Sequence, residues 1–232
     1  MTVILVPGFW LTAESWSAVV PAIEAAGHDV LAVTLPGLES PDADRAGITL
    51  ADHVGAVVQA IAAAGQPVTL VGHSGGASVI AGAADAHPEL IRRLVYVDSA
   101  PPSHGQPIND ELPAVDGQIP LPEWAAFDEP DLRDLTPELR ELFQSIAVPQ
   151  PAHVATDPAV LVNDAARRAI PAVIITTSYP AELVQQFVDQ GAPLAAEWAA
   201  TEQRTVIELP TGHWPQLTKP AELAAALLEA IG

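Results

Sequence analysis

Residues 68–77 read Val-Thr-Leu-Val-Gly-His-Ser-Gly-Gly-Ala. A short, apolar run rich in β-branched residues ends at Gly72, Ser74 follows, and small residues continue to Ala86. This pattern predicts a strand, a sharp turn and a helix, with the serine in the turn. Because glycine lacks a Cβ atom, Gly72 and Gly76 relieve the crowding that such a turn creates. We therefore expect Ser74 Oγ above the carboxyl end of the strand; the alternative is a glycine-rich turn with an incidental serine.

The composition indicates one soluble α/β domain with an insertion. Hydrophobic residues make up 49% of the 232 residues, enough for a large core. Nine basic and 29 acidic residues give a formal charge of −20, which argues against binding to nucleic acids or anionic membranes. The lack of cysteine excludes disulfides, thiolate nucleophiles and thiolate metal sites. No leader sequence and no apolar run of about 20 residues are present, so we expect a cytoplasmic protein.

Apolar runs alternate with amphipathic segments along most of the chain. We expect strands over residues 3–6, 29–35, 68–73, 94–98, 173–177 and 205–209. We expect helices over residues 14–26, 49–64, 75–86, 180–190 and 219–231. Continuously apolar strands that alternate with helices are typical of a parallel sheet covered on both faces. The predicted fold class is therefore α/β.

The alternation stops between residues 100 and 170. This stretch is rich in proline and contains several short candidate helices. We interpret it as a cap or lid inserted over the carboxyl edge of the sheet. The predicted organisation is a core domain of residues 1–99 and 171–232, interrupted by a cap of residues 100–170.

A serine hydroxyl is a weak nucleophile until a base removes its proton. Among the seven histidines, His213 is the best placed, because it lies in a loop just after the last predicted strand. Loops at this edge of an open parallel sheet converge, so His213 can approach Ser74 from the far end of the sequence. His73 is adjacent to the serine and is expected to brace the turn.

The developing oxyanion needs N–H donors. The Gly75 N–H, directly after the serine, is one candidate, and the Phe9 N–H in the loop after the first strand is the other. An ordinary strand-ending turn remains the alternative for Pro7-Gly8. Two residues are candidates for the acid that orients the base: Asp98 ends one predicted strand, whereas Glu182 follows another by several residues. We prefer Asp98 and keep Glu182 as the alternative.

Four motifs, taken in order, resemble the α/β-hydrolase superfamily, and within it small esterases of the methylesterase and hydroxynitrile lyase type and their bacterial relatives. These motifs are Pro7-Gly8-Phe9-Trp10, Ala25-Ala26-Gly27-His28, Gly72-His73-Ser74-Gly75-Gly76 and Thr211-Gly212-His213-Trp214. The resemblance implies an α/β-hydrolase fold with a sheet of six parallel strands and a cap. It also implies a Ser74–His213 pair with an acid, and oxyanion donors at Phe9 and Gly75.

The chain departs from this family's pattern in three places. Pro7-Gly8 replaces the usual His-Gly, and the common Asp after the penultimate strand is absent, which leaves the acid open. Hydroxynitrile lyases carry a lysine after the catalytic histidine, whereas Trp214 occupies that position here. This difference favours an esterase over a lyase. Dehalogenases and epoxide hydrolases of this fold carry Asp at the nucleophile position, so Ser74 argues against those activities.

The sequence therefore predicts a cofactor-free, metal-free serine hydrolase that cleaves a small, largely apolar carboxylic ester through an acyl-enzyme. Four aromatic residues are expected to line the substrate pocket: Trp10, Trp124, Phe127 and Trp214. Three other interpretations stay open: a cofactor-free lyase or oxygenase on the same fold, a non-catalytic small-ligand receptor, and hydrolysis of an amide or lactone, which the sequence does not separate from ester hydrolysis. The expected partner is a small-molecule ester, and a homodimer is left open.

Overall fold

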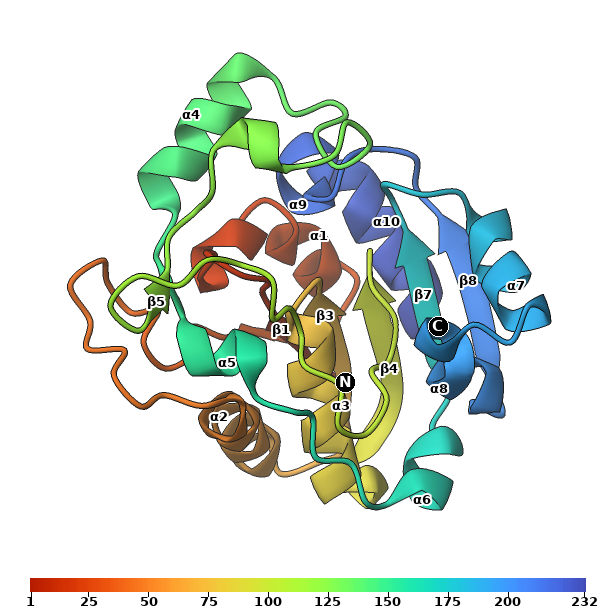
Figure 1. The fold of residues 1–232 in the computed structure, drawn as a ribbon. Helices are drawn as coiled ribbons and strands as arrows, with labels where there is room; N and C mark the ends of the chain where they lie inside the picture. Colours follow the sequence, from red (N-terminus) through yellow and green to blue (C-terminus); the bar gives the residue numbers. More distant parts are fainter.

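Six parallel strands form the central sheet, in the order β2-β1-β3-β4-β7-β8, in the computed structural model, which describes residues 1–232 (Figure 1). Strand order reverses between β1 and β3, and ligands of open α/β sheets bind beside such a reversal. Ser74 directly follows β3, on this side of the sheet. The predicted six-stranded parallel α/β architecture is confirmed. The strands are β1 (Thr2–Val6), β2 (Asp29–Ala32), β3 (Val68–His73), β4 (Ile91–Val97), β7 (Ala172–Thr176) and β8 (Arg204–Glu208).

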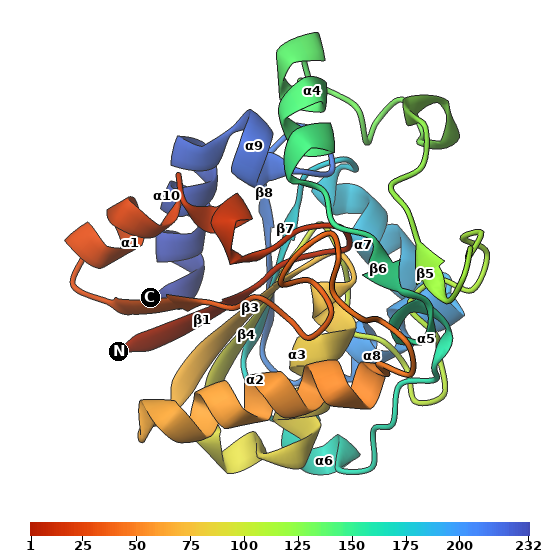
Figure 2. The ribbon, with the colours of Figure 1, turned by 90° about the vertical axis from the view of Figure 1, so that its left-hand side faces the viewer.

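Helices cover both faces of the sheet, because successive strand residues point to opposite sides. In β1, Ile4 and Val6 belong to one buried cluster, whereas Val3 and Leu5 belong to the other. Figure 2 shows α1 and α10 on one side of the sheet and α2 and α3 on the other. The helices that cover the faces are α1 (Val20–Ala25), α2 (Leu50–Ala64), α3 (Gly76–Ala86), α7 (Ala181–Asp189), α8 (Ala196–Ala200) and α10 (Pro220–Ile231).

The start of α2 follows the sequence signal closely. Thr49 is the N-cap; its hydroxyl accepts a hydrogen bond from the Asp52 N–H, and the Asp52 carboxylate accepts one from the Thr49 N–H. This reciprocal pair satisfies two N–H groups that a helix start leaves free. The prediction of one helix over residues 14–26 is wrong. The chain forms a 3₁₀ turn, η1 (Ala13–Trp16), and then α1, because Pro21 cannot continue a helix but fits its first turn.

The segment from 100 to 170 contributes no strand to the central sheet. Its elements are short, and Figure 2 shows α4 standing above the edge of the sheet beside α9 (Pro215–Thr218). None of the helices combines the length and the apolar character required to cross a membrane. The elements of this segment are β5 (Gln118–Ile119), η3 (Trp124–Ala126), α4 (Pro137–Ile146), β6 (Gln150–Pro151), α5 (Ala152–Thr156) and α6 (Asp164–Arg168).

Candidate active site

Ser74 lies in a strained turn between β3 and α3. Its φ is 51°, in the left-handed region that residues with a Cβ atom rarely adopt. Its N–H donates to the Val97 carbonyl at 3.1 Å, which ties the turn to the neighbouring strand β4. A Cβ atom on Gly72 would lie 2.7 Å from the Gly76 carbonyl oxygen, and one on Gly76 would lie 2.7 Å from that of Pro7. The turn therefore requires both glycines, and it presents the serine hydroxyl at the carboxyl edge of the sheet.

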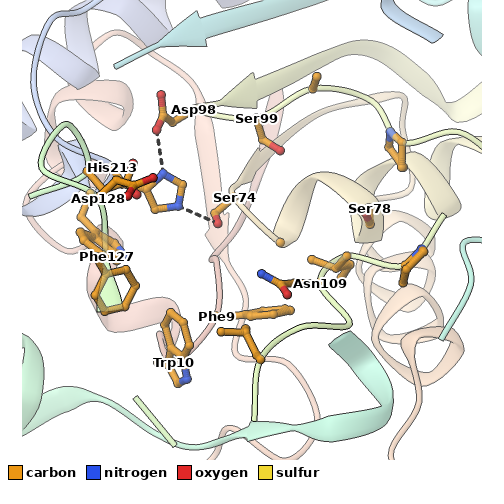
Figure 3. A pocket seen from close by; sticks show the side chains of 18 of the residues that line it. Phe9, Trp10, Ser74, Ser78, Asp98, Ser99, Asn109, Phe127, Asp128 and His213 are labelled. Carbon is orange, nitrogen blue, oxygen red and sulfur yellow. Dashed lines mark hydrogen bonds and ion pairs between the residues drawn. The ribbon is translucent and has the colours of Figure 1, made fainter. Parts of the chain in front are cut away.

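The structure brings His213 to this hydroxyl. Its Nε2 lies 2.8 Å from Ser74 Oγ, and Figure 3 shows the ring between Ser74 and Asp98. The loop that carries His213 is bound to the end of β7, where the Thr211 N–H donates to the Thr177 carbonyl at 3.1 Å. The Thr177 hydroxyl donates to the Gly212 carbonyl at 2.9 Å. The position of the imidazole is therefore fixed by the sheet edge, 139 residues away from the serine in sequence.

Asp98 completes the hydrogen-bonded series. One carboxylate oxygen, Oδ2, accepts from His213 Nδ1 at 2.7 Å and from the Ser178 hydroxyl at 2.8 Å. The other, Oδ1, accepts the N–H groups of Thr177 at 2.7 Å and Ser178 at 2.9 Å. The side chain is only 1% exposed. Burial of a carboxylate is costly unless it is paired, and four donors meet that requirement here.

The alternative acid, Glu182, does not approach His213. It lies in the first turn of α7 and is exposed. The structure thus brings together three of the predicted residues, Ser74, His213 and Asp98, and leaves Glu182 outside. The residues that hold Asp98 from the end of β7, Thr177 and Ser178, were missed by the sequence reasoning, because nothing in their local pattern marks them as partners of a residue about 80 positions earlier.

The electrostatics of the series follow from this geometry. Burial lowers the pKa of His213, but the hydrogen bond to Asp98 and the charges of Asp98 and Asp131 outweigh it, so this pKa lies above its ordinary value. Burial raises the pKa of Asp98, but its bonds to His213 and Ser178 outweigh that effect and lower it. Asp98 is therefore ionised at neutral pH. Its hydrogen bond to Nδ1–H leaves Nε2 as an acceptor for the Ser74 hydroxyl proton.

His73, next to Ser74 in the sequence, supports the loop that carries His213. It is fully buried, its Nε2 lies 2.6 Å from the His213 carbonyl oxygen, and Gln216 Nε2 lies 3.3 Å from its Nδ1. Burial, together with the nearby His213, lowers the pKa of His73 to about 3. The ring is therefore uncharged at neutral pH and donates its Nε2–H to the carbonyl. His73 supports the backbone that carries His213.

Two backbone N–H groups beside the serine are free to bind an anion. Neither the Phe9 N–H nor the Gly75 N–H donates a hydrogen bond within the protein, and both residues line the cavity next to Ser74. Gly75 is the N-cap of α3, where the helix dipole favours negative charge. The Phe9 ring packs directly over Gly75, so a Cβ atom on Gly75 would lie 2.6 Å from it. This packing holds the two segments side by side.

The side chain of Ser74 faces a cavity of about 500 Å³. Trp10, Phe127 and Trp214 line it, as the sequence predicts, and their rings meet edge to face. Trp124 does not line this cavity. It lies against the outer side of Phe127 and Trp214 and borders a separate hollow with Arg140, because the short turn η3 directs it away from the serine.

Two further carboxylates, Asp128 and Asp131, line the cavity near His213. Burial raises the pKa of Asp131, and its backbone carbonyl accepts the His213 N–H at 2.8 Å. The potential ligand atoms of Asp98, Asp131 and His213 lie within 4.8 Å of one another, a spacing that a metal ion could bridge. However, Asp98 and His213 are already engaged with each other at 2.7 Å. Their hydrogen bonds account for this cluster as it stands.

Comparisons with known proteins find an alpha/beta hydrolase family and two esterases. The model of a family described as "Alpha/beta hydrolase family" matches residues 3–226. Over 112 residues, the chain is 37% identical to the carbendazim hydrolyzing esterase of Nocardioides sp. (strain SG-4G). The aligned region covers 47% of this chain and 46% of that protein. Over 108 residues, it is 34% identical to esterase PIR7B of Oryza sativa subsp. japonica, with coverages of 44% and 40%. The matched part spans less than half the length of either relative.

Solved structures extend the likeness to the whole fold. An extracellular alpha/beta-hydrolase from a Paenibacillus species, described as sharing structural and functional homology with tobacco salicylic acid binding protein 2, superimposes with a TM-score of 0.77. The alignment covers 99% of this chain and 98% of that one at 22% sequence identity. At this identity the likeness concerns the fold alone.

Proposed function

The chain belongs to the alpha/beta hydrolase family, and on that premise we propose that it is a serine esterase that acts through an acyl-enzyme on Ser74. One observation carries the proposal: Ser74 Oγ, His213 and the buried Asp98 form a continuous hydrogen-bonded series with distances of 2.8 and 2.7 Å. A nucleophile bonded to a base, which is itself oriented by a third group, is the arrangement that acyl transfer requires. The esterases among its relatives support the same reaction class.

In the first half of the reaction, Ser74 Oγ attacks the ester carbonyl carbon while its proton moves to His213 Nε2. The new C–O bond turns the carbonyl oxygen into an oxyanion, which the N–H groups of Phe9 and Gly75 bind. Asp98 stabilises the imidazolium and holds the tautomer that accepts the proton. His213 then donates this proton to the leaving alkoxide oxygen, the ester C–O bond breaks, and an alcohol departs.

In the second half, the acyl group is transferred to water. His213 Nε2 accepts a proton from a water molecule as its oxygen attacks the acyl carbon, and the same two N–H groups bind the second oxyanion. The bond to Ser74 Oγ breaks, and His213 returns the proton to this oxygen. The products are a carboxylic acid and the regenerated enzyme. No cofactor enters the proposed cycle.

The cavity supports an apolar ester as substrate. Its aromatic walls, Phe9, Trp10, Phe127 and Trp214, favour an apolar group, whereas the carboxylates of Asp128 and Asp131 disfavour a negatively charged one. Residues from the segment 100–170, among them Ile108 and Phe127, form part of this wall. We therefore propose that this segment acts as a cap over the core formed by residues 1–99 and 171–232.

Hydrolysis of p-nitrophenyl esters of increasing chain length tests the proposal. We expect Ser74→Ala to lower kcat by about 10⁴-fold or more, whereas the exposed Ser145→Ala should match the wild type. A fluorophosphonate probe should label Ser74, located by mass spectrometry. An unlabelled serine in the folded protein would favour a non-catalytic receptor. Activity that survives Ser74→Ala but not His213→Ala would contradict an acyl-enzyme and favour a lyase or oxygenase.

A further inference from the structure

A second cavity, of about 290 Å³, borders the loop that carries Asp98. Its other walls are α7, α8 and the 3₁₀ turn η4 (Pro193–Ala195) between these helices. Nine of its eleven lining residues are hydrophobic, among them Leu183, Phe187 and Trp198. Such a lining suits an alkyl group, because burial of apolar surface drives binding there and few polar groups require partners.

This cavity adjoins the one at Ser74. Four residues line both: Asp98, Ser99, Ala100 and Leu194. Leu194 is 51% exposed and lines both hollows. A chain that leaves the reacting carbonyl along Ser99 and Ala100 would cover Leu194 and enter the second cavity.

We propose that the second cavity is a subsite for the acyl chain of the substrate, so that the enzyme prefers esters of medium-chain carboxylic acids. This inference rests on the proposed function. The leaving oxygen must face His213, which protonates it. Figure 3 shows Ser99 and His213 on different sides of Ser74, so the arm that passes Ser99 is the acyl arm rather than the alcohol.

The size of the cavity sets the chain length. At about 30 Å³ for a group the size of a water molecule, a volume of 290 Å³ holds roughly nine or ten such groups. Part of the mouth is taken up by the carbonyl end, so a chain of about six to eight carbons fills the subsite. Each buried methylene should raise kcat/KM about fourfold until the cavity is full.

The test uses p-nitrophenyl acetate, butyrate, hexanoate and octanoate, which share one leaving group. In the wild type, we expect kcat/KM to rise from acetate to octanoate by at least 30-fold. Leu183→Trp enlarges a side chain that lines the second cavity, so it should reduce the octanoate-to-acetate ratio at least tenfold. Leu142→Trp, a substitution at an exposed leucine on α4, is the matched control and should keep the wild-type ratio. Phe187→Ala, which enlarges the cavity, should shift the optimum to longer chains.

The outcomes separate this inference from the proposed function. If the folded Leu183→Trp and Phe187→Ala variants both keep the wild-type chain-length profile, the subsite is wrong although the esterase stands. If the variants alter only the profile for alkyl acetates of increasing alcohol length, the assignment to the acyl arm is wrong. If the folded wild type hydrolyses none of these esters and is not labelled by a fluorophosphonate, both proposals fail.

Discussion

Substitution of Gly212 by alanine tests how the base is positioned, because this residue lies against the backbone of Asp131 and Arg133 in the segment 100–170. A Cβ atom on Gly212 would fall on the backbone carbonyl oxygens of Asp131 and Arg133, much closer than real Cβ atoms approach other atoms. The φ of Gly212 is not in the left-handed region, so alanine fits the backbone itself and the contact is the sole perturbation. We infer that the loop of Gly212 and the segment 100–170 must separate by about 1 Å.

The expected loss of activity follows from the neighbouring geometry. His213 is the next residue, and its N–H donates to the same Asp131 carbonyl at 2.8 Å, so the displacement acts directly on the base. A shift of about 1 Å would carry Nε2 out of its 2.8 Å hydrogen bond with Ser74 Oγ. Misplacement of a catalytic group by 1 Å costs about 10²-fold in rate. We therefore expect Gly212→Ala to lower kcat/KM about 100-fold, mainly through kcat.

The assay is hydrolysis of p-nitrophenyl butyrate, together with the rate at which a fluorophosphonate labels Ser74. Gly55→Ala is the matched control, because a Cβ atom on Gly55 in α2 meets no atom within 4 Å. This control should keep wild-type activity. If Gly212→Ala folds, as judged by circular dichroism, and retains more than a third of the wild-type kcat/KM, the segment 100–170 does not position His213 and the reasoning is refuted.

Two further predictions concern the hydrogen-bonded residues Ser74, His213 and Asp98, and a third concerns the buried Arg167, which is paired with Asp85 and Glu197. Asp98→Asn should lower kcat about 10⁴-fold by favouring the wrong tautomer of His213, whereas Glu182→Gln should change it less than twofold; the reverse ranking would overturn the acid assignment. The base works only when neutral and its pKa is raised, so kcat/KM should fall with decreasing pH along a limb whose apparent pKa lies above 6.5. A limb at or below 6.5 would contradict this, and residual activity of Asp98→Asn should show the limb at lower pH. In urea denaturation, Arg167→Met should lower the free energy of unfolding by about 3–5 kcal/mol, because it leaves the buried carboxylate of Asp85 without a charged partner. The more exposed Arg168→Met should cost about 1 kcal/mol or less; equal losses would show that burial does not decide the effect.

Much of the fold is predictable from local sequence patterns. The serine turn, the capping box at Thr49 and the apolar strands each depend on residues within a few positions, and the sheet and most helices were predicted to within about three residues. Predictions failed where two local signals compete. The segment 14–26 has helical spacing of its apolar residues, but Pro21 overrides it and starts a new helix. The approach of the insertion to the loop at Gly212 has no local signal at all.

The site was predictable to the extent that sheet topology fixes it. A local motif identified Ser74. The position of His213 just after the last strand identified it as the base, because the carboxyl ends of all parallel strands lie at one edge of the sheet. The aromatic pocket was less predictable. Trp124 and Phe127 are three residues apart in the insertion, yet only Phe127 lines the cavity, because the intervening turn η3 separates their directions. Sequence spacing does not determine such a direction outside regular elements.

The location of the acid shows how two strands can share one function. In the register of the sheet, Val97 at the end of β4 pairs with Ile175 of β7, so the residues that follow both strands reach the same point. Asp98 extends this pairing by donating its N–H to the Ile175 carbonyl at 2.8 Å, while its φ of 47° turns the carboxylate toward β7. At the end of β7, Ser178 supplies its hydroxyl and N–H as donors. The end of β4 therefore supplies the buried carboxylate, and the end of β7 supplies hydrogen-bond donors instead of a second acid. These donors offset the free-energy cost of burying the carboxylate.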